Sequence, residues 1–431
     1  MRHLCTPPSL SAAHRQHGLS LIELMVALVI GLIFAIAVLL VQSSLTKQNV
    51  QMSDVMQRDS QTRAALDLIT RDLSNAGYML DGVQTPCAIL LAYDSAINSA
   101  PFAQYPVAAA SQPLTLPTST TPGSVNYPSN SPSPNAYGSA QQFTDMVFIT
   151  SATSALKAPG GTNLSGYVVQ NSTTQAANGQ GALDSGVLPL GSTAGLQVGD
   201  TAMLRMNLNG RQACFRVPIA KIGPSTAPSS TYISSKTSKL FPTTAYKAFN
   251  NPLIKAGLLP AGGSLTNSNF IQSRLTDLGA PISSTLQTVV YYIANFGNAS
   301  KGSYPMLMRA TLNAQSDALV TAPAPVAAGV VSLQVLFGVD ETNTGNVTNY
   351  LTWPAVVSGQ FTQNVRSVLF ALVTKSLQSD PSYTAPASVS IPSPSLGPGQ
   401  FTAYTVPAAY SHNHFSVIQS EVAIRNHLWT H

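Results

Sequence analysis

The chain has 431 residues, of which 44% are hydrophobic and only 9% are charged, against roughly 25% charged in ordinary soluble domains. Its formal net charge of +5 is small for this length, and no Lys/Arg cluster interleaved with aromatic residues occurs, so the composition disfavours nucleic-acid binding. Ser, Thr, Asn, Gln, Ala and Pro take the place of charged residues, which favours an exported protein.

The first element along the chain is an apolar run at residues 24–41, which contains no charge, no proline and no polar side chain. This length suffices for a transmembrane helix, and residues 1–22 contain Arg2 and Arg15 but no acid. The bulk of the chain is therefore expected on the outer side of the membrane. A secretory signal peptide cleaved after Ala37 is a second interpretation, although the run continues beyond that site, and a plain membrane anchor is a third.

A single long helix is predicted from residue 19 to residue 77. No proline interrupts this range, apolar residues after Val41 recur at three- and four-residue steps, and Asn75-Ala76-Gly77 provides a stop signal. Apart from Ser20 and Glu23, the range 19–41 is apolar all round, whereas the remainder carries a single apolar stripe. We therefore expect a helix that protrudes at one end and packs on a globular head at the other.

The globular head is expected to comprise residues 78–431. Segments rich in β-branched and aromatic residues predict strands at residues 145–151, 166–170, 201–206, 214–217, 286–295, 306–311, 331–338, 365–374 and 414–425. Residues 365–374 could instead form a short buried helix. Long Ser/Pro-rich stretches near residues 91–140, 222–265 and 377–400 are expected to be loops. The predicted fold class is α+β, with a long N-terminal helix on a mostly antiparallel sheet.

The residues ahead of the apolar run, Gly18-Leu19-Ser20-Leu21-Ile22-Glu23, resemble the class III signal of type IV pilins and type II secretion pseudopilins. The resemblance implies the type IV pilin fold. It also implies that prepilin peptidase cleaves between Gly18 and Leu19, removes residues 1–18 as a leader and methylates the new N-terminal amine. Leu19 is a mild departure, because the family most often has Phe at this position.

Glu23 would become the fifth residue of the processed chain. A charged group within an apolar helix costs about 2.5–3.5 kcal/mol on insertion scales and therefore needs a partner. In a filament of bundled helices, the amine of Leu19 on a neighbouring subunit can neutralise this carboxylate. The resemblance thus implies that Glu23 guides subunit assembly. The alternative is that Glu23 reaches the lipid headgroups beside its own amine.

Further patterns along the chain resemble the PilW family of minor pilins. They are RAALDLITRDLSNAGY at 63–78, VGDTAML at 198–204, VVYYIAN at 289–295, MLMRA at 306–310, VVSLQVLFGVDETNTGNVTNYLTW at 330–353, VRSVLFALVTKS and AIRN. The resemblance implies a structural subunit of a tip complex that primes pilus assembly and so supports twitching motility and adhesion. A minor pseudopilin of a type II secretion system is the alternative.

The same resemblance implies partners and a location. The partners are prepilin peptidase, other minor and major pilins, the inner-membrane assembly platform and a large tip adhesin. Before assembly the chain would be a single-pass inner-membrane protein with its head in the periplasm, and after assembly it would lie in the surface pilus. No cofactor and no direct contact with nucleic acid is expected.

The chain contains three cysteines, Cys5, Cys87 and Cys214. Cys5 lies in the part expected to be removed, which leaves Cys87 and Cys214 as the only pair in an oxidising compartment. A disulfide between them is predicted, and two buried free thiols are the alternative.

Signals for catalysis or metal binding are weak. The motifs G-x-S-x-G, H-E-x-x-H and G-x-x-x-x-G-K are absent, so we expect no enzyme; a membrane-anchored hydrolase with an unrecognised site is the alternative. The acidic stretch that begins at Asp340 resembles a shortened calcium loop with Asp340 and Asn343 as weak ligand candidates, although a hairpin turn explains it equally well. His412 and His414 would share one strand face, a pattern more typical of a solvated surface than of a metal site.

Overall fold

The computed structural model divides into two compact units, Met1–Met56 and Gln57–His431. It describes residues 21–77, 87–92, 106–111, 144–152, 167–168, 187–190, 196–219, 221–222, 229–232, 250–251, 253–254, 256–270, 273–279, 286–298, 302–312, 319–320, 322–342, 344–359, 361–362 and 364–424.

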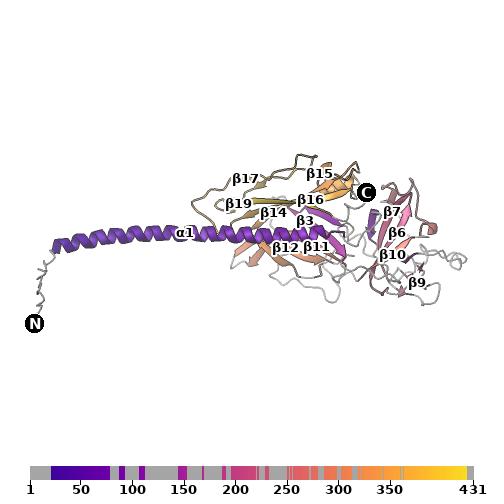
Figure 1. Ribbon diagram of the computed structural model, residues 1–431, viewed down its shortest axis with the longest axis horizontal. Coiled ribbons are helices and arrows are strands. Elements are labelled where there is room, and N and C mark those ends of the chain that lie inside the picture. Colours follow the sequence, from indigo (N-terminus) through magenta and orange to yellow (C-terminus); the bar gives the residue numbers. More distant parts are fainter. Residues whose placement is uncertain are drawn as a thin grey trace, which may run out of the picture. The chain divides into compact units, whose positions relative to one another are not determined.

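The first unit is the N-terminal part of α1 (Leu21–Ser74), a helix of 54 residues that continues into the second unit (Figure 1). At 1.5 Å per residue the helix is about 81 Å long. It is long and apolar enough to cross a membrane. Between Leu21 and Val41 the large apolar side chains are exposed. The helix ends where Gly77 adopts a φ of 72°, a left-handed conformation that favours glycine.

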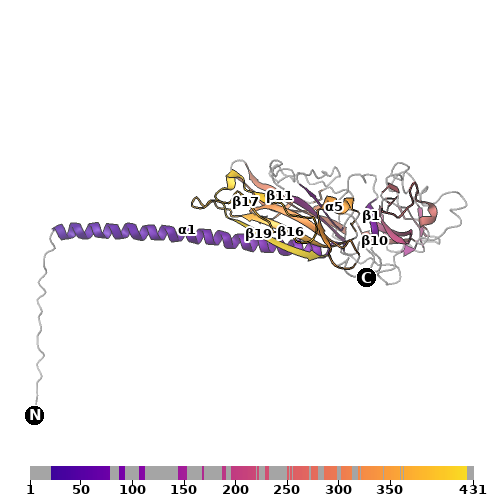
Figure 2. The same ribbon diagram turned by 90° about the horizontal axis from the view of Figure 1, so that it is seen from above.

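The second unit contains two antiparallel sheets (Figures 1 and 2). The β11 sheet has the order β13 (Ala324–Ala328), β12 (Gly302–Leu312), β11 (Leu286–Asn298), β3 (Asp145–Ala152) and β2 (Val107–Ser111). The β14 sheet has the order β15 (Asn349–Leu351), β14 (Val330–Val339), β16 (Val365–Lys375) and β19 (Phe415–Ala423). The short helix α5 (Trp353–Ser358) lies between β15 and β16 in the sequence.

One hydrophobic core joins the two sheets to the part of α1 that belongs to this unit. Ala65, Ile69 and Leu73 of α1 are almost fully buried in this core, which also contains side chains from β11, β12, β14 and β16. Their spacing of four residues places them on one face of the helix. All ten residues of β14 are buried, as expected of a strand that is covered on both faces.

The start of β3 links the β11 sheet to the β14 sheet. The Thr144 hydroxyl donates to the carbonyl of Leu333 at 3.3 Å and accepts from the amide of Leu333 at 3.1 Å. The Asp145 carboxylate accepts from the amide of Val335 at 2.9 Å. These side chains satisfy backbone groups of β14 that no strand pairs at this point.

Two segments of the chain begin and end close to the end of β3, one between α1 and β2 and one between β3 and β11. The amide of Gly77 donates to the carbonyl of Thr150 at 2.9 Å, and the amide of Thr150 donates to the carbonyl of Pro106 at 2.9 Å. Ala152 stands directly opposite Leu286 in the β3–β11 ladder. Residues 78–105 and 153–285 are therefore two insertions whose ends meet at β3.

These insertions contribute a third sheet, the β6 sheet, with a core of its own. Its order is β1 (Cys87–Ala92), β7 (Arg211–Pro218), β6 (Thr201–Leu208), β10 (Arg274–Gly279) and β4 (Tyr167–Val168). Leu204, Phe215 and Leu275 point into a core that also takes side chains from residues 253–270. The remaining short elements are β5 (Val187–Leu190), β8 (Lys221–Ile222), β9 (Ser229–Tyr232), η2 (Asn267–Phe270), β17 (Ser388–Val389), β18 (Tyr404–Thr405) and η3 (Ala408–Tyr410).

The predicted α+β fold class is confirmed by the long apolar helix and the antiparallel sheets. Residues 365–374 form strand β16 and not a helix. The division into a leader, a helix and a single head stays a prediction, because residues 1–20 lie outside the described residues.

Candidate assembly segment and the contacts that anchor its helix

Glu23 lies in the first turn of the described part of α1. It lines a shallow apolar depression together with Ile22, Val26, Ala27 and Ile30. A carboxylate in the first turn of a helix interacts favourably with the positive end of the helix dipole. Gly18 and Leu19 lie outside the described residues, so cleavage, methylation and the pairing of Glu23 with an amine stay predictions.

The apolar side chains that follow Glu23 form an exposed surface in the first unit. Leu21 and Phe34, for example, have exposed fractions of 78% and 68%. A continuous apolar surface of this kind is stable only in a membrane or against other apolar helices. The first unit is therefore suited to burial in lipid or in a bundle of similar helices.

The last turn of α1 is held on the β11 sheet by a polar cluster of Asp72, Tyr291 and Arg309. One carboxylate oxygen of Asp72 accepts from the Tyr291 hydroxyl at 2.6 Å and from Nε of Arg309 at 3.0 Å. Tyr291 and Arg309 stand opposite each other on β11 and β12. Burial raises the pKa of the Tyr291 hydroxyl, and the neighbouring Asp72 carboxylate raises it further, so the hydroxyl stays a donor.

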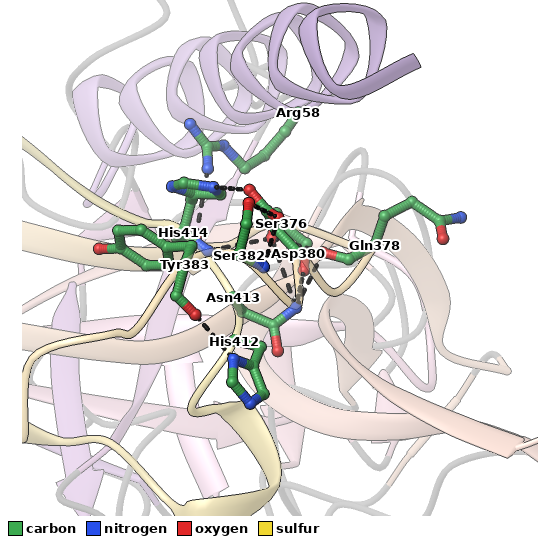
Figure 3. A network of polar contacts seen from close by, with 9 residues as sticks. All are labelled: Arg58, Ser376, Gln378, Asp380, Ser382, Tyr383, His412, Asn413 and His414. Carbon is green, nitrogen blue, oxygen red and sulfur yellow. Dashed lines mark hydrogen bonds and ion pairs between the residues drawn. The ribbon is translucent and has the colours of Figure 1, made fainter. Parts of the chain in front are cut away.

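A second polar contact holds α1 four turns earlier, at Arg58. This side chain is 7% exposed, and its Nη1 donates to the carbonyl of His414 at 3.4 Å, while Nε and Nη2 contact the Asp59 carboxylate at 3.3 and 3.2 Å. Figure 3 shows Arg58 reaching from the helix to the turn that contains His414. The turn precedes β19, so Arg58 connects α1 with the edge of the β14 sheet.

Around His414, a network orders two loops of the head (Figure 3). The His414 ring stacks on Tyr383 with a centroid distance of 3.9 Å, and its Nε2 lies 3.2 Å from Oδ2 of Asp380. The other oxygen of Asp380 accepts from the amide of Ser382 at 3.0 Å and from its hydroxyl at 2.5 Å. The bonds from Ser382, followed by the contact with His414, lower the pKa of the Asp380 carboxyl.

His412 and His414, which were predicted to share a strand face, contact different partners. Nδ1 of His412 lies 2.7 Å from the carbonyl of Tyr383, whereas His414 faces Asp380. Among the described residues, no three His, Cys, Asp or Glu side chains are grouped so as to hold a metal ion.

Asp340, the weak calcium candidate, is fully buried in a turn. Its carboxylate accepts from the amides of Thr344 and Gly345 at 3.0 and 2.7 Å and lies 3.4 Å from Nη2 of Arg366. Burial raises the pKa of this carboxyl, but the two amides and Arg366 outweigh burial and lower it. A calcium ion would have to displace these donors. Asn343 lies outside the described residues, so calcium binding stays a prediction.

The predicted disulfide partners lie on neighbouring strands. β1, which begins at Cys87, runs parallel to β7, and Cys87 stands opposite Gln212. Cys214 is fully buried and follows Gln212 by two residues, so both point to the same face of β7. The strand pairing is compatible with the bridge, which stays a prediction because the side chain of Cys87 is not among those described.

Sequence reasoning missed the two polar anchors of α1. A signal for them was present, because Arg58, Thr62, Ala65, Ile69 and Asp72 follow one another at steps of three and four residues. The polar members of this series therefore lie on the buried face of the helix. Their partners on β11, β12 and the turn before β19 could not be identified without the tertiary fold.

Comparison with known proteins finds two matching regions in the chain. Residues 290–426, from within β11 to beyond β19, match the family model for type IV pilus-assembly protein W, and residues 13–39 match the prokaryotic N-terminal methylation motif. No curated protein and no solved structure matches the chain. The second match includes Gly18, Leu19 and Glu23, in agreement with the resemblance noted in the sequence. The chain is therefore similar to the PilW family in its C-terminal part and to type IV pilins in its N-terminal motif.

Proposed function

We propose that this pilin is a minor structural subunit of the type IV pilus tip, where it primes assembly and supports twitching motility and adhesion. The observation that carries the proposal is the combination of a prepilin motif at residues 13–39 with a PilW region at residues 290–426. The region with the prepilin motif contains the start of the exposed apolar helix. The PilW region contains most strands of the two sheets on which the rest of the helix is anchored. The protein then acts by assembly, without catalysis or a cofactor.

Processing is proposed to generate the assembling form. Prepilin peptidase cuts between Gly18 and Leu19 and methylates the new amine, and Glu23 pairs with the amine of a neighbouring pilin. The exposed apolar surface of the helix supports this sequence of events, because it is suited first to lipid and then to a helix bundle. Before assembly the head lies in the periplasm, and afterwards the subunit lies in the surface pilus with other minor and major pilins and a tip adhesin.

The test combines processing with assembly. N-terminal sequencing of the mature protein should begin at a methylated Leu19; a start after Ala37 would contradict the proposal. Glu23→Ala should leave cleavage intact but remove the protein from sheared pili, because the carboxylate that pairs with the amine is lost. Asp67→Ala is the matched control, since Asp67 is an exposed acid on the same helix and should assemble normally.

Deletion of the gene separates this proposal from a role in type II secretion. Loss of pili and of twitching, with normal protein export, is expected. Normal pili combined with defective export would instead identify a minor pseudopilin.

A further inference from the structure

Strand β19 lies at the edge of the β14 sheet, where its described partner is β16. The amide of Ser376 donates to the carbonyl of His414 at 2.8 Å, and the amide of Ile424 donates to the carbonyl of Arg366 at 2.9 Å. These two bonds fix the pattern of the ladder, because residues that bond to the neighbouring strand alternate with residues that do not. The backbone N–H and C=O groups that point away from β16 therefore belong to Phe415, Val417, Gln419, Glu421 and Ala423.

In the part of the chain that the structure describes, this outer edge of β19 is open. Its outward N–H and C=O groups make no hydrogen bond to any described residue. Glu421 and Ala423 are exposed, and Phe415, Val417 and Gln419 are half-buried. An open edge of this kind is a template for a further strand, because its donors and acceptors already have the spacing of a sheet.

The other edge strands of the two sheets have features that oppose edge-to-edge pairing. β13 contains Pro325, and its register with β12 is interrupted between Leu307 and Met308. β15 has only three residues, and β2 lies against helix α5. β19 has nine residues, contains neither Pro nor Lys, and pairs with β16 without a register shift. It is therefore the edge best suited to accept another strand.

The side chains of β19 do not repel a neighbouring strand. Its charged residue is Glu421, whose carboxylate accepts from the hydroxyls of Tyr350 at 2.8 Å and Ser367 at 2.5 Å and is thus directed at the head. Phe415 and Val417 pack against a hydrophobic cluster of the sheet and remain half-exposed. A strand added at this edge would cover these apolar side chains as well as the backbone groups.

Neither the end of the chain nor a symmetric second copy fits this edge. Residues 425–431 follow the last described residue, and a reversal of direction leaves at most about five of them to pair, too few for β19. A second copy in an antiparallel pair through the same edge would have its α1 reversed, because β19 and α1 run in the same direction in Figure 2. Two chains inserted from one side of a membrane cannot have opposite helix directions. A strand from a different protein satisfies both conditions.

We propose that the outer edge of β19 binds an extended strand of a different pilus subunit, which continues the β14 sheet across the boundary between the two subunits. This inference rests on the proposed function, because the partner is another subunit of the same pilus. The backbone groups provide the affinity, so the partner is selected mainly by its extended conformation. The contact is separate from the pairing of Glu23 with an amine.

The experiment uses cells in which Ala423 is replaced by the photoreactive residue p-benzoylphenylalanine, and mass spectrometry identifies the cross-linked peptides in sheared pili. A peptide from another pilin is expected. Gln419→Pro should reduce this product about tenfold or more, because proline removes an N–H that pairs with the added strand. Gln419→Ala is the matched control. It removes the same side chain, whose Nε2 donates to the carbonyl of Pro392 at 2.6 Å, but it keeps the N–H and should retain the product.

Folding of the variants is measured separately. Because the N–H of residue 419 points away from β16, Gln419→Pro and Gln419→Ala should have the same midpoint of urea unfolding. Ala423→Pro, with the photoreactive residue at position 419, repeats the experiment at a second outward position. The test therefore does not depend on the folding of one variant.

Three outcomes would overturn the inference and leave the proposed function intact. The first is a chain that enters sheared pili but forms no cross-link to another pilin, and the second is an equal yield from Gln419→Pro and Gln419→Ala. The third is a cross-link to a second copy of this chain or to a protein outside the pilus. Absence of the wild-type chain from sheared pili would instead contradict the proposed function, and the inference with it.

Discussion

Removal of the Asp72 carboxylate tests whether the polar cluster at the end of α1 stabilises the head. Asp72→Ala would leave the Tyr291 hydroxyl and the Arg309 guanidinium without the oxygen that accepts from both. Loss of one partner from a buried ion pair costs about 3–5 kcal/mol. Asp72 and Arg309 retain side-chain exposures of 18% and 29%, so water compensates part of this cost. We expect the free energy of unfolding to fall by about 2–3 kcal/mol.

The assay is urea denaturation followed by tryptophan fluorescence. Trp353 is a suitable probe, because it is 9% exposed in the shared core and its ring lies 5.0 Å from that of Phe337. Asp67→Ala removes an exposed acid from the same helix and should change the free energy of unfolding by less than about 0.5 kcal/mol. An equal, small effect of both substitutions would refute the assigned role of the cluster.

A double-mutant cycle with Tyr291→Phe makes the test specific. Tyr291→Phe removes only the hydroxyl and should cost about 1–2 kcal/mol, because Asp72 keeps its bond from Arg309. If the hydroxyl acts through Asp72, the two substitutions are not additive, and the coupling should be about 0.5–3 kcal/mol. Additivity would show that each residue acts independently.

Three further predictions concern other parts of the head. Burial raises the pKa of the Asp277 carboxyl to about 7, so the folded state binds this proton more strongly than the unfolded state does. The free energy of unfolding of the wild type therefore falls as the pH rises from about 4 to about 7, and Asp277→Asn should remove this pH dependence. This fall is about 4 kcal/mol at most and roughly 2 after solvent screening, measured by urea denaturation at pH 4 and pH 8. Gly329→Ala should destabilise the head by about 1–3 kcal/mol in the same assay, because its φ is 77° and a Cβ would lie 2.6 Å from the carbonyl oxygen of Lys375. Cys87→Ser should lower stability by about 2–5 kcal/mol and abolish the mobility change on reduction; unchanged mobility would exclude the disulfide.

Local signals in the sequence predicted the elements of the head better than their arrangement. The long helix was predictable because its apolar run, its periodic stripe and its stop at Gly77 are all local. The central strands β11 and β14 were predictable because they are long and rich in β-branched residues, whereas the sequence of β16 was also compatible with a short buried helix. The insertions were not predictable, because the pairing of Ala152 with Leu286 joins residues far apart in the sequence.

The N-terminal motif of the candidate site was predictable from the sequence, whereas the contacts that anchor its helix were not. The motif around Gly18 and Glu23 is contiguous, so the sequence alone indicated processing and an assembly residue. The contacts of Asp72 with Tyr291 and Arg309 span more than two hundred residues and depend on the β11–β12 register. Periodicity could have marked Asp72 as lying on the buried face, but not what it binds.

The two polar anchors together restrict the helix more than its apolar contacts do. Arg58 and Asp72 are 14 residues apart, close to four helical turns, so they lie on the same face at a separation of about 21 Å. A shift of the helix by one residue would rotate that face by about 100° and remove both side chains from their partners. Apolar side chains tolerate small shifts because their contacts are not directional, whereas the bonds of Arg58 and Asp72 depend on orientation. The anchors therefore fix the rotation and the axial position of α1 within the head, and loss of both should permit alternative positions that loss of either one does not.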